Sequence, residues 1–135
     1  MAKKDTIFAL ATPVGKSALA VFRISGPKSH KVIKKISHKK NTENNKTNIG
    51  QIYDEKKTID QVMLTFFKSP KSYTGEDMVE VSCHGGLATI KGLTNTFYKN
   101  GLRMADPGEF TRRALENNKV NLVEVEAIGD LVNAN

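Results

Sequence analysis

Two charged residues interrupt segments of the chain that otherwise read as apolar strands. Arg23 stands between Phe22 and Ile24, and Glu80 stands between two valines. Successive side chains of a strand point to opposite faces, so each charge lies on the face opposite its neighbours. A carboxylate can accept two parallel hydrogen bonds from an N–H and an amino group side by side, as on a pterin ring, and an arginine can pair with an acidic group. Taken alone, the two residues fit equally simple surface charges or one cross-strand salt bridge.

A doubled glycine, Gly85-Gly86, follows the strand that carries Glu80 and precedes a helical pattern. Free backbone N–H groups at the start of a helix suit a carboxylate or a phosphate, although tight turns use the same residues. His84, directly before the glycines, can contact a ligand or can simply close the turn, and the sequence does not decide between these roles. His84, Gly85 and Gly86 are therefore candidates for further ligand contacts.

The sequence Gly15-Lys16-Ser17 resembles the end of a phosphate-binding loop but lacks the rest of that motif. The motif needs a glycine five residues before Gly15, where Leu10 stands, and a helix afterwards, where the pattern predicts a strand. We therefore expect no hydrolysis of GTP or ATP by this chain alone.

A metal site and a cysteine nucleophile are also not expected. Cys83 and His84 are adjacent, so on a strand they point to opposite faces, while His30 and His38 lack the spacing of metal ligands. Cys83 is predicted to be a small buried residue.

Composition indicates one domain with a single core and an excess of positive charge. The 135 residues carry a formal net charge of +7, concentrated in a lysine-rich segment at residues 28–57. This segment is interpreted as a solvated surface, with contact to RNA as the alternative. The single cysteine and the absence of a secretory signal pattern predict a cytoplasmic location.

The pattern of elements predicts an α+β fold, with a mixed or antiparallel sheet of about five strands and three to four helices. Residues 37–48 have no apolar period and are expected to form an exposed loop. The expected strands are residues 6–12, 18–25, 49–53, 59–67, 78–82 and 102–105. The expected helices begin with Pro27 in the first position, follow Gly86 as far as Asn100-Gly101, begin at Pro107 behind an Asp106 N-cap, and begin after Asn121.

Two further expectations concern the continuation of the chain after the last predicted helix and the exposure of two arginines in the third. The apolar stripe after Asn121 runs nearly to residue 135, so we expect the natural polypeptide to continue beyond it. Arg112 and Arg113 of the third helix are expected to be ordinary surface charges.

Several ordered sequence blocks resemble the N-terminal domain of the MnmE/TrmE family of tRNA-modification GTPases. They cover nearly the whole chain except its lysine-rich middle, and they read DTIFALATPVGKSALAVFRISG, SYTGEDMVEVSCHGG, GLRMADPGEFTRRALENNKVNL and EAIGDLV. The resemblance implies a fold like the tetrahydrofolate-binding domain of the glycine-cleavage aminomethyltransferase. It also implies a folate-binding and dimerisation domain at residues 1–118, the start of a helical domain at 119–135, and a G domain outside this chain.

The resemblance further implies a function. Such a domain binds 5-formyl- or 5,10-methylene-tetrahydrofolate through Arg23, Glu80 and Lys119 and forms a homodimer. The parent GTPase, which holds GTP, magnesium and potassium on its G domain, works in the cytoplasm with MnmG, also called GidA, to modify the wobble uridine of tRNA at C5. The alternative hypothesis is a basic RNA-binding module without a folate site.

Overall fold

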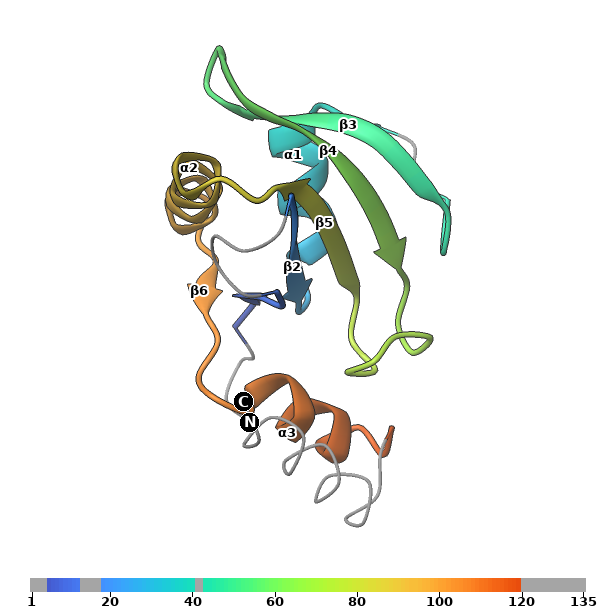
Figure 1. Ribbon diagram of the computed structural model, residues 1–135. Helices are drawn as coiled ribbons and strands as arrows, with labels where there is room; N and C mark the ends of the chain where they lie inside the picture. Colours follow the sequence, from blue (N-terminus) through green and yellow to red (C-terminus); the bar gives the residue numbers. More distant parts are fainter. Residues whose placement is uncertain (1–4, 13–17, 41–42, 120–135) are drawn as a thin grey trace.

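The strands of the chain form one six-stranded mixed sheet in a computed structural model that describes residues 5–12, 18–40 and 43–119 (Figure 1). Neighbouring strands follow the order β3-β4-β5-β2-β1-β6, and they run antiparallel except for the parallel pair of β1 and β6. This confirms the predicted α+β class, and the six strands correspond to the six segments expected as strands. The strands are β1 (Ile7–Leu10), β2 (Leu19–Ser25), β3 (Thr47–Asp54), β4 (Lys57–Phe67), β5 (Met78–His84) and β6 (Arg103–Met104).

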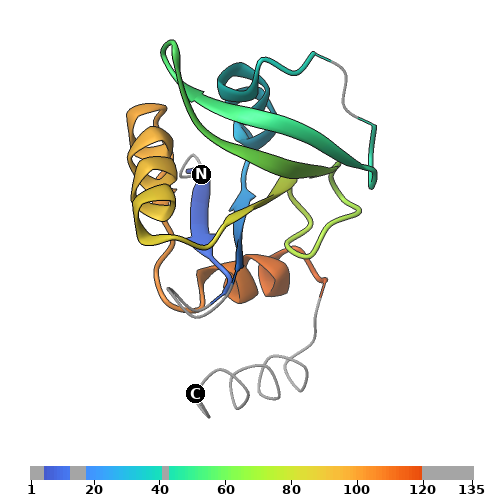
Figure 2. The same cartoon turned by 45° about the horizontal axis from the view of Figure 1, so that its top comes forward.

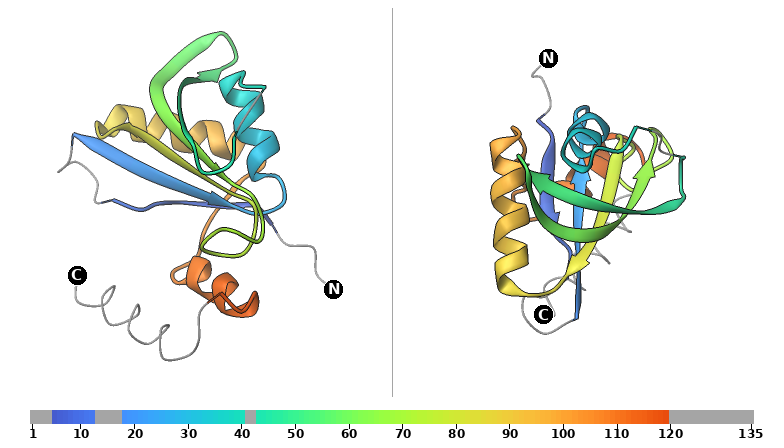
Figure 3. Two further views of the ribbon diagram at one scale, coloured as in Figure 1. Left: turned by 90° about the vertical axis from the view of Figure 1, so that its right-hand side faces the viewer. Right: turned by 90° about the horizontal axis from the view of Figure 1, so that it is seen from above.

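Helices α1 (Ser29–Ser37) and α2 (Leu87–Lys99) pack against one face of the sheet, and the core lies between them and the strands. The left view of Figure 3 shows both helices against the sheet, with α3 (Glu109–Glu116) apart from them at the bottom. The core helices contribute Val32, Ile33 and Ile36 from α1, and Ile90, Leu93 and Phe97 from α2. We call this covered side the core face and the opposite side the outer face.

Successive side chains of the central strands point alternately to the core face and to the outer face. In β2, Ala20, Phe22 and Ile24 are buried in the core, so Arg23 between them lies on the outer face. In β5 the alternate residues Val79, Val81 and Cys83 are likewise in the core. Glu80 therefore shares the outer face with Arg23.

The ends of α1 and α2 follow the backbone signals in the sequence. His38 ends α1 in the left-handed conformation, with φ of 57°. Gly101 follows α2 with φ of 85°, which confirms Asn100-Gly101 as the stop signal. Figure 2 shows α2 as a regular helix along one edge of the molecule.

Helix α3 begins two residues later than the sequence predicts. Gly108, in the left-handed conformation with φ of 75°, is its N-cap in place of the expected Asp106. Half of the expected capping box nevertheless forms, because Glu109 Oε1 accepts a hydrogen bond from the Asp106 backbone N–H at 2.9 Å. The start at Pro107 was wrong because a glycine turn separates the cap residue from the first helical turn.

The turn after β2 requires glycine at position 26. Gly26 has φ of 139°, and a Cβ atom there would lie 2.6 Å from the Thr6 Cα. Its N–H donates to the Asp77 carbonyl at 3.0 Å, which joins this turn to the start of β5. The close approach of the two chain segments excludes any larger residue.

Part of the loop predicted for residues 37–48 lies along the sheet. The Asn45 N–H donates to the Phe66 carbonyl at 2.9 Å, and β3 already begins at Thr47. The helix predicted after Asn121 lies outside the described residues. Among the described helices, none has the length and apolar character needed to cross a membrane.

Candidate functional site

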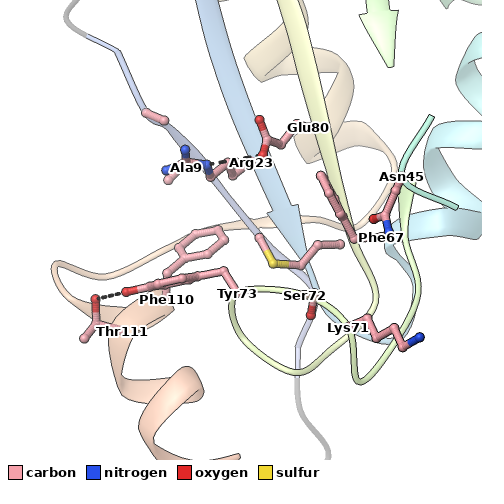
Figure 4. Close-up of a pocket in the computed structure, with 12 residues that line it drawn as sticks. Ala9, Arg23, Asn45, Phe67, Lys71, Ser72, Tyr73, Glu80, Phe110 and Thr111 are labelled. Carbon is pink, nitrogen blue, oxygen red and sulfur yellow. Dashed lines mark hydrogen bonds and ion pairs between the residues drawn. The ribbon is translucent and has the colours of Figure 1, made fainter. Parts of the chain in front are cut away.

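A cavity of about 770 Å³ opens on the outer face of the sheet, between the central strands, the loop of residues 68–77 and α3 (Figure 4). Its walls combine charged and polar side chains with apolar and aromatic ones. The lining residues are Ala9, Ala11, Arg23, Asn45, Phe67, Lys71, Ser72, Tyr73, Met78, Glu80, Phe110 and Thr111.

Arg23 and Glu80 are direct cross-strand neighbours at one end of this cavity. They face each other in the register of β2 and β5, and the Arg23 Nε lies 4.0 Å from Glu80 Oε1. Their side chains are 50% and 35% exposed. The 4.0 Å separation of these two atoms is longer than a hydrogen bond, so the two groups form an ion pair without a hydrogen bond between those atoms. Both groups therefore keep donors and acceptors for a ligand.

Ala9 makes room beside this pair. It stands opposite Arg23 in the register of β1 and β2. Its methyl group leaves the outer face open where a larger side chain would fill it. On the other flank, Thr65 of β4 faces Glu80 and makes a hydrogen bond to Thr47 at 2.9 Å.

The rest of the cavity is mainly apolar. Met78 and Phe67 face each other across β5 and β4, two residues along the strands from the charged pair. Tyr73 of the loop and Phe110 of α3 line the facing wall, and the Tyr73 hydroxyl lies 3.0 Å from Thr111 Oγ1 (Figure 4). Such a site suits a flat organic ligand with one polar edge.

Arg113 joins α3 to the loop and to Asp5, which precedes β1. Its side chain is 6% exposed, and its Nη1 donates to the Asp5 carbonyl at 2.7 Å and to Glu76 Oε1 at 3.1 Å. Its Nη2 donates to Glu109 Oε2 at 3.2 Å. The prediction of a surface charge was correct for Arg112, which is 60% exposed, and wrong for Arg113. Helical periodicity could not reveal this because the partners of Arg113 come from distant segments.

Glu109 binds a second arginine in addition to Arg113. Arg103 binds both of its carboxylate oxygens, through Nη1 at 3.0 Å and Nη2 at 2.7 Å, and also contacts Asp5 at 2.8 Å. The Arg103 hydrogen bonds lower the pKa of the Glu109 carboxyl to about 2, against its burial, which acts to raise it. The same bonds raise the pKa of Arg103. We call Glu76, Glu109, Arg103 and Arg113 the ionic cluster.

The loop is also fixed to β2 and to the end of α3 by side-chain hydrogen bonds. Ser25 Oγ lies 2.7 Å from Thr74 Oγ1 and donates to Glu76 Oε1 at 2.7 Å. The Asn117 side-chain amide donates to the Thr74 carbonyl at 2.8 Å. These bonds and the ionic cluster hold the loop and α3 in position around the cavity.

Lys119, the third residue of the expected folate site, lies at the edge of the same loop. A Cβ atom added to Gly75 would be 3.2 Å from Lys119 Cγ, so the lysine stem runs past the loop backbone. The lysine is exposed and is absent from the cavity lining. Lys119 thus lies beside the loop of residues 68–77 without lining the cavity of Arg23 and Glu80.

The doubled glycine does not join the charged pair. His84 ends β5, four residues or roughly 13 Å along the strand from Glu80. Its Nδ1 lies 2.7 Å from Asp60 Oδ1, and it lines a separate hollow of about 200 Å³. The Gly85 N–H donates to the Ala18 carbonyl at 2.9 Å, and Gly86 is the N-cap of α2. His84, Gly85 and Gly86 therefore do not line the cavity of Arg23 and Glu80, and their contact with a ligand stays a prediction.

Cys83 is buried in the core, as predicted. Burial raises the pKa of its thiol to about 11, so it stays protonated at neutral pH. In the described part of the chain, no three His, Cys, Asp or Glu side chains gather in a way that could hold a metal ion.

The sequence identified the charged pair but missed the apolar part of the cavity. Tyr73 and Phe110 both lie in the sequence blocks that carry the family resemblance, yet no periodicity connects a loop tyrosine with a helix phenylalanine. Met78 and Phe67 could have been assigned to the outer face from strand alternation.

Comparison with known proteins agrees with the sequence blocks. The model of the family described as GTP-binding protein TrmE N-terminus matches residues 6–119. Proteins named tRNA modification GTPase MnmE are similar along nearly the whole chain. The one from Thermotoga maritima is 50% identical over 131 residues, which cover 96% of this chain and 29% of that protein.

Other organisms carry similar proteins of the same name. The relative from Fervidobacterium nodosum is 47% identical over 137 residues, covering 97% of this chain and 30% of that protein. The relative from Streptococcus mutans is 43% identical over 133 residues, covering 96% and 29%. The chain thus spans less than a third of the length of these relatives.

Proposed function

Because the chain belongs to the TrmE N-terminus family, we propose that it is the folate-binding and dimerisation module of a tRNA-modification GTPase. The observation that carries the proposal is the meeting of Arg23 and Glu80 at one end of a mainly apolar cavity. A reduced folate has a polar pterin edge, flat rings and an acidic tail, and the cavity offers partners for the first two.

The residues present fit such a ligand chemically. Glu80 accepts hydrogen bonds from the amino and N–H groups of the pterin edge, and Arg23 binds polar or acidic parts of the same molecule. Lys119 is the third proposed contact, with its ammonium group directed to the glutamate tail. The bound folate supplies the one-carbon unit, and this chain contributes position and electrostatics.

For the whole protein we propose a role in tRNA modification, which agrees with the names of the relatives, and the finer role that the sequence resemblance implies. Together with MnmG, the parent protein modifies the wobble uridine of tRNA at C5 in the cytoplasm. Its G domain, outside this chain, binds GTP with magnesium and potassium and hydrolyses it. Within that protein, Arg23, Glu80 and Lys119 hold the one-carbon donor.

Homodimerisation is supported by apolar side chains left on the outer face. Leu19, Ile49 and Met63 line the hollow beside His84 and are 49%, 65% and 41% exposed. Exposed apolar groups gathered in this way are typical of interaction surfaces. Light scattering is expected to give twice the 14.9 kDa mass of one chain. A monomer at every concentration tested would contradict the proposed dimer.

Titration of the chain with 5-formyl-tetrahydrofolate tests the binding proposal. We expect saturable binding in the micromolar range, about 8 kcal/mol of binding free energy. A parallel titration with tRNA at several salt concentrations tests the alternative function. Strong tRNA binding that falls steeply with salt, without any response to folate, would favour the RNA-binding module.

A further inference from the structure

The positive charge of the chain is concentrated in one stretch that the proposed folate site does not use. Residues 28–57 contain nine lysines and three acidic residues, while the rest of the chain has nearly equal numbers of basic and acidic residues. Nearly all of the net charge of +7 therefore lies between the start of α1 and the start of β4. This stretch also lies outside the sequence blocks that resemble the MnmE/TrmE family.

Four of these lysines lie along α1 and its N-cap, on the side of the helix that faces away from the sheet. Helix positions three and four residues apart share a face, and the opposite face of α1 carries its buried residues. In the described part of the chain, none of the four side chains makes an ion pair or a hydrogen bond. Their ammonium groups are therefore free to bind anions. We call Lys28, Lys31, Lys34 and Lys35 the lysine stripe.

The lysine stripe ends at a pair of stacked rings. The imidazole of His38, the C-cap of α1, lies parallel to the phenol ring of Tyr53 on β3. The ring centroids are 4.2 Å apart, and the angle between the planes is 5°. His38 is exposed and Tyr53 is half-buried, so the imidazole is the outer ring of the pair. An exposed aromatic face beside lysines is a combination that binds unpaired nucleotides.

Beside the stacked rings lies a hollow of about 400 Å³, between the ends of α1 and α2 and the turn from β3 to β4. Lys35 and Lys99 line it together with Asp54 and Glu55, so its charges balance, unlike those of the lysine stripe. Lys99 Nζ binds Asp54 Oδ2 at 2.9 Å. Carboxylates can accept hydrogen bonds from the amino groups of a nucleobase, whereas phosphates are attracted to unpaired lysines. The hollow therefore suits a base, and the stripe suits a phosphate backbone.

We propose that the lysine stripe and the stacked rings form a contact surface for tRNA, a role that rests on the proposed function in tRNA modification. The stripe binds backbone phosphates, and an unpaired base stacks on His38 with its edge toward the hollow. An anionic membrane fits less well, because α1 exposes no large apolar side chain and the carboxylates of the hollow repel lipid phosphates. The folate cavity lies on the outer face of the sheet, so both ligands can bind at once.

Substitution of single lysines tests the stripe. The probe is a fluorescently labelled RNA hairpin with the sequence of a tRNA anticodon arm, and its anisotropy is expected to show micromolar-range binding at about 0.1 M salt. Lys31→Ala and, separately, Lys35→Ala should each weaken binding about 5-fold and reduce the slope of log K against log salt by about 0.7–0.9. Lys91→Ala, at an exposed position of α2, is the matched control and should leave the affinity unchanged.

Substitution of the outer ring tests the stacking. His38→Asn removes the ring and suits the left-handed backbone, in which φ is 57°. It is expected to weaken the hairpin RNA about 10-fold, and to change little the binding of a fully paired RNA duplex with the same number of phosphates. Tyr53→Phe keeps the stack and is expected to stay within about 2-fold of the unsubstituted protein. Equal losses on the two RNAs would overturn the base-stacking role.

The outcomes that overturn the proposal are separate from a failure of the folate function. If folded Lys31→Ala and Lys35→Ala bind the hairpin RNA as well as the unsubstituted protein, the contact surface is overturned. Binding to vesicles of phosphatidylserine and phosphatidylcholine, with none to RNA, would overturn the assignment to RNA. The same variants should keep their affinity for 5-formyl-tetrahydrofolate. If the unsubstituted protein binds no folate, the proposed folate function fails whatever the RNA result.

Discussion

Replacing Arg113 with methionine is expected to lower the free energy of unfolding by about 3–5 kcal/mol. The guanidinium is almost fully buried and bonds Glu76, Glu109 and the Asp5 carbonyl. Methionine fills a similar volume but leaves Glu76 without its arginine in a site that is largely shielded from water. Urea unfolding followed by circular dichroism measures the change.

Arg112→Met is the matched control, one residue away on the same helix. Arg112 is 60% exposed, and its contacts with Glu109 and Glu116 are long, at 3.6 and 4.0 Å. Its loss should change stability by no more than about 0.5 kcal/mol. Equal effects of the two substitutions would contradict the assignment of Arg113 to a buried cluster.

The second large effect is a loss of stability in acid that depends on Glu109. Its folded-state pKa is about 2, below the ordinary value of 4.5, so the carboxylate stabilises the fold above pH 4.5. This contribution falls as the pH drops from 4.5 toward 2 and amounts to about 3 kcal/mol in total. Between roughly pH 6 and pH 3 the loss is about 2 kcal/mol. Urea unfolding at the two pH values measures it.

Glu109→Gln isolates this contribution from the other carboxyl groups that titrate in the same range. The variant is less stable near neutral pH because Arg103 and Arg113 lose their shared carboxylate. Its further loss on going to about pH 3 should be smaller than that of the unsubstituted protein by about 2 kcal/mol. Equal losses in the two proteins would show that Glu109 does not titrate with a lowered pKa.

Strand alternation predicted much of the fold and half of the site. The isolated charges in β2 and β5 were assigned to the face opposite their apolar neighbours, and Arg23 and Glu80 do meet there. Local signals also predicted the end of α2 at Gly101 and the burial of Cys83. These features depend on interactions between residues close in sequence, which patterns describe well.

Long-range contacts account for what the sequence did not predict. Whether Arg113 is buried depends on Asp5 and Glu76, which lie 108 and 37 positions away. The doubled glycine, a candidate for ligand contacts, follows the end of β5 that lies away from the cavity of Glu80. Which end of a strand carries a pocket is decided by the segments that cover it, here a loop and α3.

The central claim is that Arg23 and Glu80 hold a folate in the cavity on the outer face. Its most direct test is calorimetric titration of 5-formyl-tetrahydrofolate into Arg23→Ala, Glu80→Gln and His84→Ala. We predict at least about 10-fold weaker binding for the first two, since each loses charge-assisted hydrogen bonds, and unchanged binding for His84→Ala at the other end of β5. Full affinity in Glu80→Gln and Arg23→Ala, with binding lost in His84→Ala, would contradict the claim.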